Sequence, residues 1–163
     1  MRWLIGLLTD TGMRLSEAAG LSKGDIHLHQ DIPFVHITPH SWRRLKTIES
    51  SRKLPLVGCA YWAAIRALNS TSNQFLFPKY CNETECHSNS ASAALNKWLK
   101  QIAGPNYVIH SLRPSLRDRL RAVNCSSEMI DQIGGWSTSR VGDRYGQGFS
   151  LKNLAAVLEQ IVI

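Results

Sequence analysis

The stretch TGMRLSEAAGLSKGDI at residues 11–26 contains the most informative local pattern of this chain. Within it, residues 14–21 predict a short helix, and Asp25 falls in the loop beyond it. Arg14 stands on the turn that leads into this helix and precedes Glu17 by three residues. A carboxylate at that spacing can hold the guanidinium and direct it outward from rigid backbone. The stretch therefore predicts a short helix that presents a fixed arginine.

Hydrophobic periodicity in the rest of the chain predicts an α+β protein that is mostly α, with a small antiparallel sheet. Strands are expected at 34–38, where FVHIT alternates, and at 52–56, where Pro55 favours a sheet edge. The basic stretch between them forms either a hairpin connection or a third short strand. The expected helices are residues 2–9, 61–68, 91–102, the run that Pro114 opens, a short helix capped at 126–128 that ends at Gly134-Gly135, and 151–163.

Composition narrows the class of protein. A chain of 163 residues is the size of one domain, and its 44% of hydrophobic residues exclude intrinsic disorder. Lysine and arginine outnumber aspartate and glutamate by 19 to 12, which gives a net charge of +7. A basic excess of this size indicates a polyanionic partner, with nucleic acid the first candidate.

The sequence carries no sign of export, membrane insertion or metal binding. The apolar stretch at residues 3–8 is too short to cross a bilayer, and no signal-peptide cleavage site follows it. We therefore expect reduced cysteines and a cytoplasmic, DNA-associated protein. Cys81, Cys86 and His87 lie close together in sequence, but no second cluster supplies the remaining ligands of a zinc site.

Several short motifs have residue types that suit phosphate chemistry. His110 and Arg113 are three residues apart, so on a helical turn both face the same way. Gly134-Gly135 precedes Trp136, whose indole N–H is a hydrogen-bond donor. Tyr145 lies in the polar stretch SRVGDRYGQG, where no apolar periodicity explains a tyrosine. Charge runs usually form solvated faces, and two such basic runs occur, with Arg43, Arg44, Lys46, Arg52 and Lys53 in the first and Arg117, Arg119 and Arg121 in the second.

Taken in order, these motifs resemble the catalytic domain of the tyrosine recombinases, the phage integrase family, over nearly the whole chain. The family's first box matches residues 11–26 and places a catalytic arginine at Arg14. Its hairpin box matches KTIESSRKLPL at residues 46–56, with Lys46 rather than Lys53 as the catalytic lysine. The remaining positions are His110 and Arg113 of the His-x-x-Arg box, Trp136, and Tyr145 as the nucleophile.

The resemblance implies site-specific DNA recombination or integration through a covalent 3′-phosphotyrosine intermediate, without a metal or nucleotide cofactor. Tyr145 attacks phosphorus, and Arg14 and Arg113 bind the nonbridging oxygens in a bidentate manner. Lys46 protonates the leaving 5′ oxygen. In the same implied scheme His110 assists proton transfer at the tyrosine and Trp136 donates its indole N–H to the phosphate. The implied partners are double-stranded DNA and other recombinase subunits, which form a tetramer on DNA.

The chain departs from the family pattern in three ways. Pro114 stands where many relatives have a second histidine, and proline disfavours the α conformation at Arg113. Residues 1–163 are expected to be a single catalytic domain that lacks the N-terminal DNA-clamping domain and the first helix of the catalytic domain. We therefore expect weak, salt-dependent DNA binding and no strand exchange by this chain alone.

An apolar stripe in residues 151–161 must be covered by the chain itself or by a partner.

Three other functions remain open at this level. The chain is alternatively a DNA-binding remnant whose catalytic residues do not assemble productively, or an enzyme with type IB topoisomerase-like strand passage. The third possibility is a basic helical interaction domain with no role on DNA.

Overall fold

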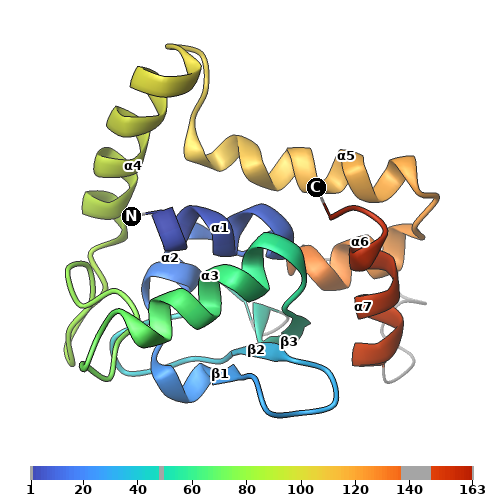
Figure 1. Ribbon diagram of the computed structural model, residues 1–163, viewed down its shortest axis with the longest axis horizontal. Helices are drawn as coiled ribbons and strands as arrows, with labels where there is room; N and C mark the ends of the chain where they lie inside the picture. The colour runs from blue at the N-terminus through green and yellow to red at the C-terminus, as the bar shows by residue number, and fades with distance from the viewer. Residues whose placement is uncertain (1, 48–49, 137–147, 163) are drawn as a thin grey trace.

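The computed structural model describes residues 2–47, 50–136 and 148–162, and Figure 1 shows a small sheet with the helices above and beside it. The predicted class, mostly helical with a small antiparallel sheet, is confirmed. In chain order the elements are α1 (Arg2–Thr11), α2 (Leu15–Ala19), the 3-10 helix η1 (Lys23–Asp25), β1 (Ile26–His27), β2 (Phe34–Ile37), β3 (Arg52–Pro55), α3 (Gly58–Asn69), α4 (Ser88–Ala103), the 3-10 helix η3 (Ile109–Ser111), α5 (Leu112–Ala122), α6 (Ser127–Gly134) and α7 (Leu151–Glu159).

The sheet is antiparallel in the order β1-β2-β3, which places Pro55 on an edge strand as predicted. Its central residue Val35 pairs with Ile26 on one side and with Leu54 on the other. The third strand of the sheet, β1, precedes β2. Of the two alternatives for the stretch between β2 and β3, its described residues form the connection and no further strand of the sheet. A strand of two residues has too short a pattern to alternate, so only the pairing with β2 reveals it.

The core lies where α1 packs on α3. Leucines 4, 7 and 8 of α1 are buried, and α3 faces them with small side chains. Small residues let the two helices approach closely, and burying each leucine stabilises the fold by roughly 1.5–3 kcal/mol. The buried residues of α3 are Ala60, Ala63, Ala64 and Ala67.

The C-terminal helix α7 packs beside β3 (Figure 1). Leu154, Leu158 and Ile161 are all buried, so the apolar stripe of this segment is covered by the chain's own fold. The carbonyl of Ile161 also accepts a hydrogen bond from the Arg119 side chain at 3.0 Å. No helix in the described part of the chain combines the length and apolar character needed to cross a membrane.

Candidate active site

Five of the six residues expected to carry the chemistry line one open pocket of about 660 Å³. They come from segments far apart in the sequence: the start of α2, the connection between β2 and β3, η3, α5 and the turn that follows α6. The sixth, Tyr145, falls in residues 137–147, outside the part of the chain that the structure describes. The residues brought together are Arg14, Lys46, His110, Arg113 and Trp136.

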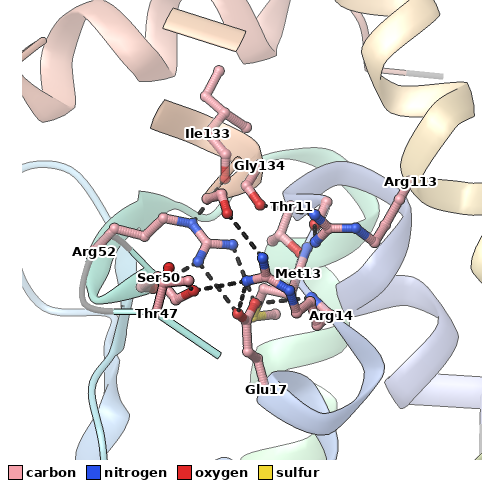
Figure 2. Close-up of polar contacts among 12 residues, drawn as sticks. Thr11, Met13, Arg14, Glu17, Thr47, Ser50, Arg52, Arg113, Ile133 and Gly134 are labelled. Atoms are coloured by element: carbon pink, nitrogen blue, oxygen red, sulfur yellow. Dashed lines mark hydrogen bonds and ion pairs between the residues drawn. The ribbon is translucent and has the colours of Figure 1, made fainter. Parts of the chain in front are cut away.

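Arg14 is held at the N-terminus of α2 by the carboxylate that its spacing predicts. Its Nη1 lies 2.8 Å from Glu17 Oε1, and its backbone N–H donates to Glu17 Oε2 at 2.8 Å. Two longer-range contacts complete its environment, because Nη1 donates to Ser50 Oγ at 2.9 Å and Nη2 to the Gly135 carbonyl at 3.0 Å. Figure 2 shows the guanidinium at the centre of these contacts. Arg14 is therefore fixed by three separate segments.

Glu17 is itself buried and shared with a second arginine. Arg52 Nη2 lies 3.2 Å from Glu17 Oε2, and the same guanidinium donates to the carbonyls of Ile133 and Ser50 at 2.9 and 2.7 Å (Figure 2). Burial alone would raise the pKa of Glu17, but Arg52 and the hydrogen bonds from Arg14 and Arg52 hold it below its ordinary value. Glu17 therefore stays ionised and anchors two cations.

The lack of a side chain at Gly135 leaves room for the buried guanidinium of Arg52. This residue caps α6 with a φ of 60°, a left-handed conformation that favours glycine. A Cβ at this position would lie 2.5 Å from Arg52 Nη1. From the sequence, the turn at Gly134-Gly135 is expected to present Trp136, and in the structure Gly135 also makes room for a buried guanidinium. The sequence does not reveal the contact between Gly135 and Arg52, because Arg52 belongs to a basic run of the kind that usually forms a solvated face.

Arg113 is buried, with 7% of its surface exposed, and its side chain binds two backbone carbonyls from distant segments. It donates to the carbonyl of Gly12 through Nη1 and to that of Gly134 through Nη2, the latter at 3.0 Å (Figure 2). Burial, followed by the charge of Arg14, lowers its pKa to about 10, and Arg52 acts in the same direction. Arg113 is thus surrounded by more positive than negative charge.

The expectation that Pro114 opens the helix and disfavours the α conformation at Arg113 is wrong. Helix α5 begins at Leu112, so Arg113 is already helical. Pro114 falls in the first turn, where the missing N–H would have had no intrahelical partner. The steric preference that proline imposes on the preceding residue is overcome here by the two carbonyls that bind Arg113.

Lys46 and His110 are exposed on the rim of the pocket. The connection that carries Lys46 is anchored by Arg43, which was expected on a solvated face but is only 2% exposed. Arg43 Nη1 donates to the Glu17 carbonyl at 3.0 Å, and its Nη2 lies 3.4 Å from Asp25 Oδ2. Asp25, predicted in a loop, is buried at the end of η1 and forms this pair.

Trp136 follows the left-handed turn and lies against two arginines of α5. The Cζ atoms of Arg113 and Arg117 are 4.8 and 4.9 Å from its ring centroid. The ring folds back over Gly134, where a Cβ would lie 1.9 Å from its carbon atoms, so only glycine fits. Arg117 also lines the pocket, although the sequence suggested only a basic run for it.

The cysteine cluster does not line this pocket. Cys81 and Cys86 pair across an antiparallel bridge, and all four cysteines are free thiols. Burial, followed by the neighbouring Cys86, raises the pKa of Cys81 to about 12, so this thiol is a poor metal ligand. Within residues 2–47, 50–136 and 148–162, no three histidine, cysteine or acidic side chains gather as a metal centre requires.

Comparison with known proteins identifies the family and the fold of the chain. The model of the phage integrase family matches residues 1–149. A solved structure of the Tn1549 transposon integrase in complex with transposon right end DNA shares the fold, with a TM-score of 0.59 and 18% identity. The similarity covers 94% of this chain and 56% of the solved chain, so this chain spans little more than half of that relative's length. No curated protein sequence matches it.

Proposed function

The chain belongs to the phage integrase family, and we propose that it cuts and rejoins DNA at specific sites through a covalent 3′-phosphotyrosine at Tyr145. In this proposal residues 1–163 form one catalytic domain, which acts on double-stranded DNA together with further recombinase subunits. The observation that supports it most is the pocket in which Arg14 and Arg113, 99 positions apart, lie with Lys46, His110 and Trp136.

The charge of the pocket suits a phosphodiester. Arg14 and Arg52 share one carboxylate, and Arg113 is held by neutral carbonyls, so the cluster carries a surplus of positive charge. A phosphate between Arg14 and Arg113 would balance this surplus. Guanidinium groups supply the paired N–H donors that bind two nonbridging oxygens at once, and these bonds strengthen as charge develops on the phosphorane.

The proposed reaction needs no metal or nucleotide. The Tyr145 oxygen forms a bond to phosphorus while the bond to the 5′ oxygen of the next nucleotide breaks. His110 takes part in removing the tyrosine proton, and Lys46 delivers a proton to the departing 5′ oxygen. Trp136 donates its indole N–H to a phosphate oxygen. Attack by a 5′-hydroxyl on the phosphotyrosine reverses the step and rejoins a strand.

Covalent trapping tests this proposal. The substrate is a randomised library of nicked duplexes, in which cleavage near the nick releases a short 5′-hydroxyl fragment and prevents rejoining. We expect a protein–DNA adduct that survives denaturing gels, forms in the presence of EDTA, and maps to Tyr145 by mass spectrometry. Sequencing the trapped DNA should reveal a preferred site.

The control is Tyr145→Phe, which removes one oxygen and preserves most of the side-chain volume. Folding measured by circular dichroism and DNA binding should survive, and the adduct should vanish. An adduct that persists in Tyr145→Phe moves the nucleophile to another residue. Binding by the unmodified chain without any adduct indicates a DNA-binding remnant, and relaxation of supercoiled DNA without sequence preference indicates topoisomerase-like strand passage.

A further inference from the structure

The indole of Trp136 depends on α5 for its position. Its backbone N–H donates to the Asp131 carbonyl at 3.0 Å, which fixes the chain just after α6. The side chain makes no hydrogen bond to the described residues. Its ring is instead held by the close approach to Gly134 and by the guanidinium groups of Arg113 and Arg117.

These two arginines differ in what else they do. Arg113 is buried and directs both terminal nitrogens to backbone carbonyls. Arg117 is about one-third exposed, lines the pocket, and pairs with the carboxylate of Asp131 at 3.1 Å. Asp131 belongs to α6, whose end leads directly into Trp136. Arg117 therefore connects α5, α6 and the indole through a single side chain.

The contact between Arg117 and Trp136 has directional consequences. A guanidinium lies favourably over an indole ring because its charge meets the negative face of the π system. Such a contact fixes the plane of the ring and therefore the direction in which the indole N–H points. Arg121, one turn further along α5, has none of these contacts: its side chain is 61% exposed and pairs only with Asp118.

We propose that Arg117 is a positioning residue for Trp136, which orients the indole N–H toward the DNA phosphate in the pocket. This inference rests on the proposed function for the identity of the phosphate and extends it by giving Arg117 a role. Arg117 acts through Trp136 and through Asp131, and it does not bind the reacting atoms itself.

A double-mutant cycle on the adduct-forming reaction tests the inference. At saturating DNA, Arg117→Gln should slow adduct formation by about tenfold, as expected for loss of a partly desolvated cation–π contact. Arg117→Lys, which keeps the charge, should restore part of the rate. Arg121→Gln removes the same charge from the same helix and should change the rate less than about twofold, as is usual for exposed surface positions.

The cycle is completed in the Trp136→Phe background. If Arg117 acts through the indole, Arg117→Gln should add less than about twofold to the effect of Trp136→Phe, because coupled residues are not additive. A second tenfold loss in that background overturns the inference, as does equal slowing by Arg121→Gln. Thermal melting of each variant confirms that the comparison is made between folded proteins.

An NMR measurement that does not require catalysis tests this inference independently of the proposed function. The indole N–H signal of Trp136 in a nitrogen–proton NMR spectrum is identified by its absence in Trp136→Phe. We expect Arg117→Gln to shift this signal and Arg121→Gln to leave it in place. If the unsubstituted chain forms no adduct, the proposed function fails, and the NMR signal alone decides on Arg117. An unmoved signal in Arg117→Gln refutes the positioning role.

Discussion

Two buried carboxylates near the N-terminus, Glu17 and Asp10, each bind arginine side chains in different surroundings. Glu17 pairs with Arg14 and Arg52 beside a pocket, whereas Asp10 pairs with Arg119 at 3.1 Å and accepts the backbone N–H of Cys59 at 2.9 Å. Helix α5 contributes to both regions, since it also carries the Arg113 that lies near the Glu17 cluster.

The difference lies in how completely each cluster is balanced. Arg119 donates through its terminal nitrogens to Asp10 and to the carbonyls of Thr9 and Ile161, so its charge is balanced within the fold. The Glu17 cluster contains more arginine than carboxylate, and Arg14 keeps 23% of its side chain exposed. A balanced cluster braces α1, α3 and the C-terminal segment together. A cluster with surplus positive charge is suited to bind an anion.

The largest expected effect comes from neutralising the two carboxylates in turn. Glu17→Gln leaves buried Arg52 without its charge partner and should lower the free energy of unfolding by about 3–5 kcal/mol. Asp10→Asn should cost less, about 2 kcal/mol, because the Arg119 side chain is 20% exposed and that of Arg52 only 6%, so water solvates the unpaired charge of Arg119 better. Urea unfolding at neutral pH measures both losses. Equal losses would contradict the distinction between the two clusters.

Acid unfolding tests how much the charge of Glu17 contributes to stability. The pKa of Glu17 in the folded state lies below its ordinary value of 4.5, so its ionisation contributes stability above that pH. This contribution is lost as the pH falls below about 4.5 and through the folded-state pKa. Glu17→Gln has no such group, and its free energy of unfolding should fall less steeply over that range.

Two arginines of α5, Arg113 and Arg119, allow a role in catalysis to be distinguished from a role in stability. Arg113→Lys keeps the charge but loses the paired donors, and adduct formation should slow by about 10²–10³-fold, as for removal of a donor to a developing oxyanion. Arg119→Lys should leave that rate within about twofold and lower the free energy of unfolding by about 1–2 kcal/mol. A rate loss in Arg119→Lys, once corrected for folded fraction, would show that the brace also serves the pocket.

Salt dependence distinguishes the pocket from the rest of the basic surface. Lys46→Gln removes a charge from the pocket rim and should lower the slope of log K against log salt by about 0.9. Lys152→Gln removes the same charge from the exposed side of α7, and we expect no change in slope. Binding to a duplex at several salt concentrations gives both slopes. Equal changes would mean that the DNA also contacts α7.

The smallest expected effect is that of Pro114→Ala. Since α5 begins before Pro114 and Arg113 is held by the carbonyls of Gly12 and Gly134, the proline is not what aims the arginine. Stability should change by less than about 1 kcal/mol, and the rate of adduct formation by less than about twofold. A larger loss of rate would show that Pro114 itself helps to position Arg113.

Sequence reasoning reached the elements and contacts that depend on neighbouring residues. The spacing of Arg14 and Glu17 predicted their ion pair, because residues three apart lie on the same side of a helical turn. The alternation at 34–38 and the position of Pro55 predicted β2 and an edge strand. Strand β1 was missed, because its two residues carry no pattern until they pair with β2.

Tertiary structure decided the partners of the remaining arginines. The sequence placed Arg43 and Arg52 on a solvated face, yet both are buried, because carboxylates and carbonyls from distant segments surround them. The same holds for the contact of Arg117 with Trp136. A charge run has no periodicity that distinguishes buried from solvated members. The types and order of the pocket residues were thus determined by the sequence. The supports that fix them are long-range hydrogen bonds, which form only when the segments around Arg14, Arg52 and Arg113 meet the end of α6.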